Sequence, residues 1–201
     1  MRAQAARNNH ILLGQLREDK HAVGLLQLSR EDASRGRLVG LAPVKNAPVE
    51  GVLLHPRFAV AQEKEDGSVK LRAVDHFSFS AGSQRKEDSV NGHVLPGEKL
   101  EHHTLDMLGE AMRYFVRRVG VVPGLMKADV DSAFRRIPVL PEHRWTCGVC
   151  FLVMGVIYAA VHAACPFGAV ASVHAWERWA CFFSCLRPLG RAYASSCLQD
   201  W

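Results

Sequence analysis

The stretch that says most about the fold is KADVDSAFRRIP, which runs from Lys127 to Pro138. If it forms a strand, the carboxylates of Asp129 and Asp131 lie on the same face, because side chains alternate along a strand. Two carboxylates on one face can hold a hard divalent cation such as magnesium through oxygen ligands. Spacing alone favours a plainer interpretation, in which a surface strand ends with two solvated acids.

The chain carries no charge for a long run just beyond this stretch. Residues 146–164 read TCGVCFLVMGVIYAAVHAA and contain no Asp, Glu, Lys or Arg. A helix of this length could cross a bilayer. β-Branched and aromatic residues are frequent in the run, and Met154-Gly155 divides it into two apolar halves, so we expect two strands joined by a tight turn. His162 would lie unpaired in lipid, which also disfavours the membrane-spanning alternative.

A second hairpin is predicted upstream, over residues 55–80. Its arms flank the turn Glu65-Asp66-Gly67-Ser68, and Asp-Gly between such arms is a strong hairpin signal. Apolar residues at helical spacing predict a helix from Thr104 to Arg118, with Thr104 as its cap and Gly120 as its stop. A further helix is expected over residues 170–186. Helices and strands that follow one another without a regular βαβ rhythm indicate an α+β fold of antiparallel hairpins and packed helices.

Composition and charge fit a globular protein in a reducing compartment. The 201 residues are 48% hydrophobic and 22% charged, with a net charge of +5. These values exclude a disordered, collagen-like or coiled-coil chain, and the positive charge permits a nucleic-acid partner without requiring one. All six cysteines lie after residue 146, and the polar N-terminus lacks the apolar stretch of a signal peptide. We therefore expect free thiols and an intracellular location, cytoplasmic or nuclear.

Three segments, taken together, resemble parts of the reverse transcriptases, which are the RNA-directed DNA polymerases of retroelements. Residues 57–75, which end in Arg72-Ala73-Val74-Asp75, resemble the fingers hairpin of that family. The stretch 129–138 resembles its first catalytic palm motif, and Pro166-Phe167-Gly168 opens a segment resembling the next palm motif in its retrotransposon form. The segments occur in family order within residues 31–178. The resemblance implies a partial right-hand polymerase fold, with fingers and an incomplete palm.

The resemblance also implies roles for the matching residues in nucleotidyl transfer. Asp129 would be the first metal-binding, catalytic aspartate, and the Val130 carbonyl would help to hold the same magnesium ion. Phosphoryl transfer of this kind uses two metals to clamp the attacking and leaving oxygens. The implied partners are a primer–template of RNA or DNA, held mainly through its phosphates, and deoxynucleotides.

The nucleotide-binding residues implied by the resemblance come from all three segments. Arg72 would pair with the incoming triphosphate, assisted by Lys64 or Lys70. Phe134 stands at the steric-gate position, where an aromatic ring excludes a ribose 2′-hydroxyl. Phe167 and Gly168 would line the nucleotide and template pocket.

One departure from the family pattern limits the expected activity. The last catalytic motif of the family is a hairpin with two adjacent aspartates, and no such pair follows Arg178; Asp200 is the only acid after Glu177. We therefore expect a truncated fragment that is inactive alone. Its expected parts are an N-terminal extension (1–30), fingers and partial palm (31–180) and a divergent tail (181–201).

Other functions stay open beside this one. A non-enzymatic nucleic-acid-binding remnant would fit the net charge and the incomplete metal site, and a small membrane protein would use the run 146–164. Cys147 and Cys150 could begin a zinc site, but alternate positions in an apolar strand explain them better. A nucleophilic Cys165 paired with His162 or His174 lacks a third orienting group.

Overall fold

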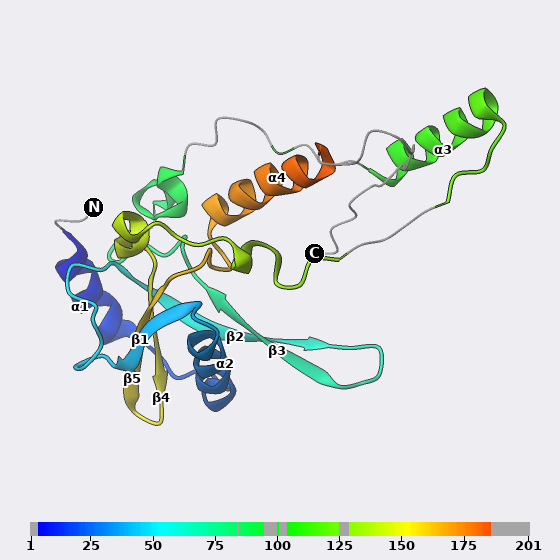
Figure 1. Cartoon of the computed structure of the whole chain (residues 1–201). Coiled ribbons are helices and arrows are strands. Elements are labelled where there is room, and N and C mark those ends of the chain that lie inside the picture. The colour runs from blue at the N-terminus through cyan, green and yellow to red at the C-terminus, as the bar shows by residue number, and fades with distance from the viewer. Residues whose placement is uncertain (1–3, 84, 95–99, 101–103, 125–128, 186–201) are drawn as a thin grey trace. The chain divides into compact units, whose positions relative to one another are not determined.

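The computed structural model describes residues 4–83, 85–94, 100, 104–124 and 129–185 (Figure 1). The chain divides into two compact units. Unit one comprises Met1–Leu95 and Phe134–Val173, and unit two comprises Pro96–Ala133 and His174–Trp201. Most of the predicted tail, Asp200 included, lies outside the described residues.

Unit one is built on a mixed five-stranded sheet with the strand order β1-β5-β4-β2-β3. The strands are β1 (Leu38–Pro43), β2 (Leu54–Glu63), β3 (Val69–Asp75), β4 (Gly148–Val153) and β5 (Val156–His162). Neighbouring strands are antiparallel, except that β2 and β4 pair in parallel through Leu54–Pro56. The predicted α+β class is confirmed, and the sheet is mixed where antiparallel hairpins alone were expected.

The apolar run 146–164 forms the β4–β5 hairpin at the centre of the sheet. Its turn has positive φ angles at Met154 (49°) and Gly155 (75°), as the tightest hairpin turns require. All of β4 except Leu152 is buried, which explains an uninterrupted apolar run in place of alternation. No helix in the described part of the chain is long and apolar enough to span a bilayer.

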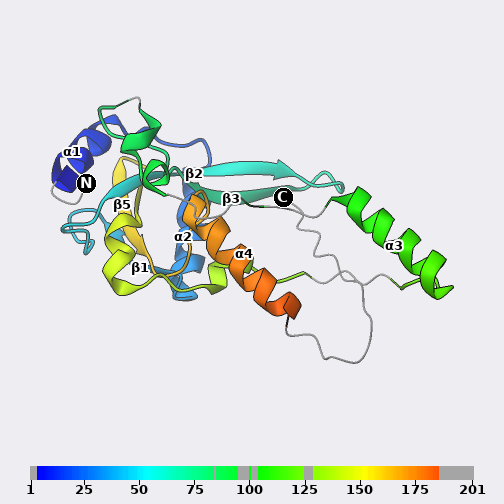
Figure 2. The same ribbon diagram turned by 90° about the horizontal axis from the view of Figure 1, so that it is seen from above.

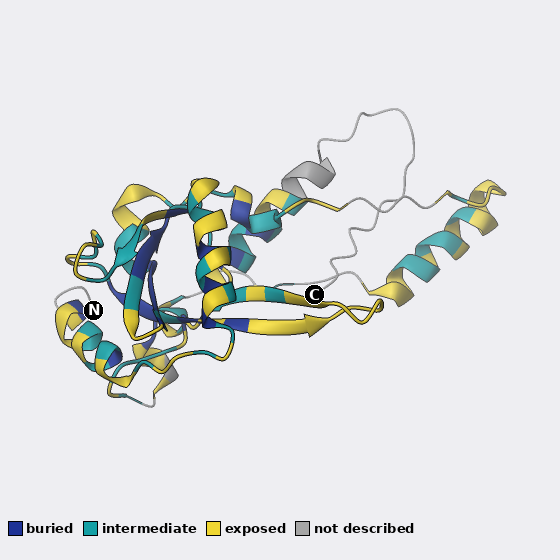
Figure 3. Ribbon diagram, turned by 90° about the horizontal axis from the view of Figure 1, so that it is seen from below, coloured by how far each residue is buried: buried dark blue, intermediate teal, exposed yellow. Residues whose placement is uncertain are grey.

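The β2–β3 hairpin extends beyond the rest of the sheet (Figure 1). Its turn is closed by the Lys64 amide donating to the Ser68 carbonyl at 2.8 Å, and Gly67 has a φ of 76°. Past Pro56, β2 pairs with β3 alone, and residues 60–70 at the far end of the hairpin are all exposed (Figure 3). The predicted turn at 65–68 is therefore confirmed.

Two N-terminal helices, α1 (Ala5–Gln15) and α2 (Ala22–Ser34), complete the core of unit one (Figure 2). Ala22 and Leu25 of α2 pack with Ala59, Phe151 and Val153 of the sheet. Gly24 allows this close approach, because a β-carbon there would lie 2.6 Å from Leu71 Cδ1. Neither helix was predicted from the sequence, although both contribute buried residues.

Unit two contains α3 (Leu105–Val119), which confirms the helix predicted over 104–118. The Thr104 hydroxyl accepts a hydrogen bond from the Met107 amide at 3.3 Å, and Gly120 ends the helix with a φ of 69°. The last helix, α4 (Val170–Cys185), begins in unit one and continues in unit two. It agrees with the predicted helix as far as Cys185, and Leu186 lies outside the described residues.

Candidate functional site

One face of the β2–β3 hairpin carries exposed cations. Lys70 lies opposite Gln62, and Arg72 lies opposite Val60, so the two basic side chains share a face. Arg72 Nε donates to Gln62 Oε1 at 2.8 Å, which holds the guanidinium against the neighbouring strand β2. Lys64 stands at the start of the turn, and all three basic residues are exposed. Within the described residues, none of the three takes part in an ion pair.

The opposite face of the hairpin is turned toward α2. Ala59 and Ala73 pack in the cluster that contains Ala22 and Leu25 of α2, and Leu71 meets Gly24. The helix therefore covers the Leu71 face of the hairpin. The Arg72 face, which also carries the partly exposed Phe58 and Val60, is left accessible.

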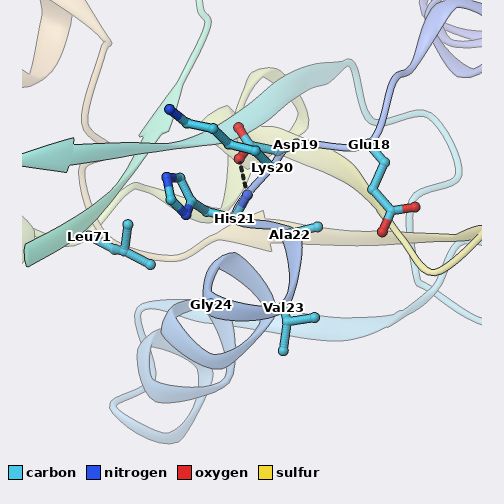
Figure 4. A pocket seen from close by; sticks show the side chains of 8 residues that line it. All are labelled: Glu18, Asp19, Lys20, His21, Ala22, Val23, Gly24 and Leu71. Carbon is cyan, nitrogen blue, oxygen red and sulfur yellow. Dashed lines mark hydrogen bonds between the residues drawn. The ribbon is translucent and has the colours of Figure 1, made fainter. Parts of the chain in front are cut away.

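A shallow pocket of about 290 Å³ opens on the covered side, at the start of α2 (Figure 4). Residues 18–24 and Leu71 line it. Asp19 holds its wall in place, because its carboxylate accepts from the His21 amide at 2.6 Å and from the Ala59 amide at 3.3 Å. The pocket lies away from the Arg72 face and includes no residue predicted to be functional.

Phe134 and Phe167 are brought together in unit one. Their ring centroids are 4.7 Å apart with the planes at 73°, an edge-to-face contact. Phe134 lies in a 3₁₀ turn (Ala133–Arg136), whereas Phe167 follows β5. The backbones of the two segments are also joined, since the Cys165 amide donates to the Ile137 carbonyl at 2.8 Å. The structure thus places the predicted gate residue against the predicted pocket residue.

Gly168 joins this aromatic pair to the end of the β2–β3 hairpin. Its φ is 90°, and a β-carbon there would lie 2.0 Å from the Asp75 carbonyl oxygen. No other residue type fits without displacing the loop, because side chains disfavour this φ and the contact is with backbone. The predicted pocket glycine therefore rests directly on the last residue of β3.

Asn91 fixes the same loop, a contact that sequence reasoning missed. Its side-chain amide donates to the Gly168 carbonyl at 2.8 Å, and its carbonyl oxygen accepts from the Val170 amide at 2.9 Å. It thereby satisfies the first amide of α4, which has no partner within the helix. Asn91 lies in the segment Ser89-Val90-Asn91-Gly92, and no residue spacing in this segment identifies it as a functional residue.

A cluster of buried charged side chains lies beneath these contacts. Arg57 Nη1 donates to Asp75 Oδ1 at 3.0 Å, and His162 Nε2 lies 2.8 Å from Asp75 Oδ2. Arg57 and Arg135 both reach Asp32 Oδ2, at 2.9 and 2.7 Å. The side chains of Arg57, Asp75, His162 and Arg135 are at most 4% exposed, and that of Asp32 is 18% exposed.

Burial and pairing act on these groups in opposite directions. Burial raises the pKa of Asp75, but Arg57 and His162 overcome it and hold that pKa at about 2, so Asp75 stays ionised. Burial lowers the pKa of His162 and so favours its neutral form, against the attraction of Asp75. Burial is the main cause that lowers the pKa of the nearby His55 to about 4.

Asp129 and Val130 belong to unit two and do not lie in a strand. Both are exposed and lack regular structure, and a turn follows at Asp131-Ser132 with a φ of 63° at Ser132. The predicted strand through Asp129 and Asp131 is therefore wrong, because the chain turns where the strand would continue. The Val130 carbonyl, predicted as a metal ligand, accepts from the Ala133 amide at 3.1 Å.

The described residues do not form a magnesium or zinc site. They contain no group of three or more His, Cys, Asp or Glu side chains placed to hold a metal ion. Asp129 is solvated, and Cys147 and Cys150 are buried in and beside β4. The magnesium ion that the family resemblance implies stays a prediction.

Comparison with known proteins finds similarity in structure. No protein-family model matches the chain, and no curated protein sequence matches it. Among solved structures, a mutant protease–reverse transcriptase of prototype foamy virus is similar, at 16% identity and a TM-score of 0.47. The match covers 88% of this chain and 19% of that one, so the chain spans about a fifth of the viral protein's length.

Proposed function

We propose that this chain forms the fingers and the first part of the palm of a reverse-transcriptase-like polymerase. In this proposal it binds a deoxynucleoside triphosphate and nucleic-acid phosphates, and it does not extend a primer by itself. The observation that carries the proposal is that residues from three separate motif segments meet in unit one. Gly168 rests on Asp75, and Phe134 packs edge to face on Phe167.

The triphosphate would bind to the accessible face of the β2–β3 hairpin. Arg72 offers a planar fork of donors that matches phosphate oxygens, and Lys70 and Lys64 add point charges. All three are exposed, and α2 packs on the other face. Phe134 would then act as the gate that excludes a ribose 2′-hydroxyl, with Phe167 as its support.

The proposal contains no catalytic step. Nowhere do the 201 residues contain two adjacent aspartates, and the described residues present no metal cluster. A role for Asp129 as a metal ligand, with Val130, stays a prediction. The chain's own residues would bind and orient the nucleotide.

The first test measures binding of a fluorescent deoxynucleoside triphosphate by anisotropy. Arg72→Ala should weaken binding by at least about tenfold, because a charge-assisted pair contributes about 1.5–3 kcal/mol when well formed. The matched control is Arg30→Ala, which removes an equally exposed guanidinium from α2. Equal losses in the two variants, or no binding by the wild type, would contradict the proposal.

A second test measures primer extension by the full chain with magnesium and deoxynucleotides. We expect none. Extension that Asp129→Ala abolishes would show that a functional metal site assembles after all.

The second candidate function is nucleic-acid binding without a nucleotide pocket. The observation that favours it is the pairing of Arg72 and Lys70 with exposed Phe58 and Val60 on one face, since cations and apolar groups together suit a strand of nucleic acid. Affinity for an oligonucleotide should then fall steeply with salt and ignore sequence. Displacement of the oligonucleotide by a free triphosphate would favour the first function, and failure to displace it the second.

A further inference from the structure

His162 lies at the centre of the buried charged cluster and contacts both Arg135 and Asp75. Its Nδ1 lies 3.0 Å from Arg135 Nη1, and its Nε2 lies 2.8 Å from Asp75 Oδ2. Arg57 Nη1 approaches Nε2 less closely, at 3.4 Å, and is already engaged with Asp75. The imidazole is fully buried, so no water competes for either nitrogen.

These two contacts define the tautomer. A guanidinium can only donate, so His162 Nδ1 must accept and carry no proton. An ionised carboxylate can only accept, so Nε2 must carry the proton. The neutral imidazole with its proton on Nε2 satisfies both partners, whereas the other tautomer satisfies neither.

This state also adds no further positive charge to the cluster. Arg57 and Arg135 face Asp32 and Asp75, and Arg37 lies 3.8 Å from Asp32, so three positive and two negative charges already lie in and beside the cluster. A proton on Nδ1 would add another positive charge and set two donors against each other at 3.0 Å. The ionisable groups that act most strongly on His162 are Asp75, Arg57 and Arg135. His55 also acts electrostatically with His162, and the rings of both histidines lie near the ring of Phe77.

Both partners of His162 support the aromatic pair. Arg135 directly follows Phe134 in the chain, and His162 and Asp32 anchor its guanidinium. Asp75 supplies the carbonyl oxygen on which Gly168 rests, next to Phe167. One imidazole therefore connects the anchor of Phe134 to the support of Phe167.

We propose that His162 is a positioning residue, which holds Phe134 against Phe167 through Arg135 and Asp75, and that protonation of its Nδ1 releases Arg135 and separates the two rings. The consequence for nucleotide selection rests on the function proposed above. The positioning itself does not, because it concerns contacts within unit one alone. The site would then be assembled at neutral pH and opened by acid.

The decisive experiment is NMR of the full chain with ¹⁵N-labelled histidine and ¹³C-labelled phenylalanine. At about pH 7 the His162 spectrum should show a proton on Nε2 and none on Nδ1, with a cross-peak between the Phe134 and Phe167 rings. The cross-peak should weaken as the solution is acidified and His162 takes up a proton. A proton on Nδ1 at neutral pH, or a cross-peak that survives protonation, would overturn the proposal.

His162→Gln is the matched variant. Its amide can donate to Asp75 while its carbonyl accepts from Arg135, so it reproduces the tautomer without a titratable group. We expect the Phe134–Phe167 cross-peak to persist in this variant and to lose its dependence on acid. A Gln variant that remains as acid-sensitive as the wild type would refute the role of His162. His162→Asn, which is too short to reach both partners, should lose the cross-peak at every pH, and its retention would also count against the proposal.

Neither NMR measurement contains a nucleotide, so this inference and the proposed function fail separately. Failure of the wild type to bind a triphosphate would leave the tautomer and the cross-peak intact. If binding does occur, the preference for deoxy- over ribonucleotide should fall severalfold on acidification in the wild type and stay constant in His162→Gln. An equal fall in both would mean that another group controls selection.

Discussion

Removal of the charge on Asp75 should destabilise unit one more than any change at its surface. The Asp75 carboxylate accepts from Arg57 Nη1 at 3.0 Å and lies 2.8 Å from His162 Nε2. In Asp75→Asn an amide takes its place, so a nitrogen must face one of these two partners and an oxygen the other. If the amide nitrogen faces His162, two donors meet. If it faces Arg57, the same conflict arises there, and in either case Arg57 loses the more deeply buried of its two counter-charges.

The magnitude follows from burial and from the pKa of the carboxyl group. That pKa is about 2 in the folded protein against an ordinary value of 3.8. At about 1.4 kcal/mol for each pH unit, the native interactions favour the ionised form by about 2 kcal/mol. Breaking a buried ion pair by removing one partner costs about 3–5 kcal/mol, because the other charge stays buried. We expect a loss in this range.

The assay is urea denaturation followed by circular dichroism, with Asp66→Asn as the control. Asp66 lies at the exposed hairpin tip, where its substitution should change stability far less. The pH dependence gives a second readout. A depressed pKa means that the contribution of Asp75 is complete above about pH 4 and is lost as the pH falls through about 2, so this loss should be absent in Asp75→Asn. A cost below about 1 kcal/mol, or an unchanged acid profile, would refute the reasoning.

Two further predictions concern the loop and the second buried histidine. Gly168→Ala should lower the free energy of unfolding by about 3 kcal/mol in thermal denaturation, since it adds a backbone clash with Asp75 to an unfavourable φ. The control Gly67→Ala has a φ of 76° but open space around it, and it should cost about 1 kcal/mol. Equal costs would show that the contact with Asp75 is unimportant. The pKa of His55 is lowered to about 4, so the stability it confers is complete above its ordinary value of 6.5 and is lost as the pH falls toward 4. His55→Gln should reduce the difference in urea midpoint between about pH 7 and about pH 5, and an unchanged difference would assign the acid sensitivity elsewhere.

Local signals explain which parts of the fold could be predicted. The Asp66-Gly67 and Met154-Gly155 turns were predictable because both place glycine where φ is positive. The helix α3 was predictable from apolar spacing and from its two ends. In contrast, α2 has no side-chain cap, and its helix contains Gly24, so its stability comes from packing on the sheet, which no local pattern reveals.

The candidate site was predictable only in part, for the same reason. Phe134, Phe167 and Gly168 were identified through motif resemblance, and they meet in unit one. The strand expected at Asp129 fails because a turn with positive φ at Ser132 follows directly.

The buried cluster was not foreseen, since its five ionisable members come from segments far apart in the chain. One signal was present. Arg57 is two residues before Ala59 on β2, so the two side chains lie on the same, inward face of the strand pair. Asp75 lies opposite Arg57 on β3, so this face carries two opposite charges.

The central claim is that the β2–β3 hairpin and the Phe167 loop form one nucleotide site. Photoaffinity labelling tests this claim most directly. The full chain would be irradiated with an azido-deoxynucleoside triphosphate, and the labelled peptides mapped by mass spectrometry. We predict labels in residues 64–72 and 166–168, both suppressed by excess unlabelled deoxynucleotide. Labels confined to other segments, or labels that excess nucleotide does not suppress, would contradict the claim.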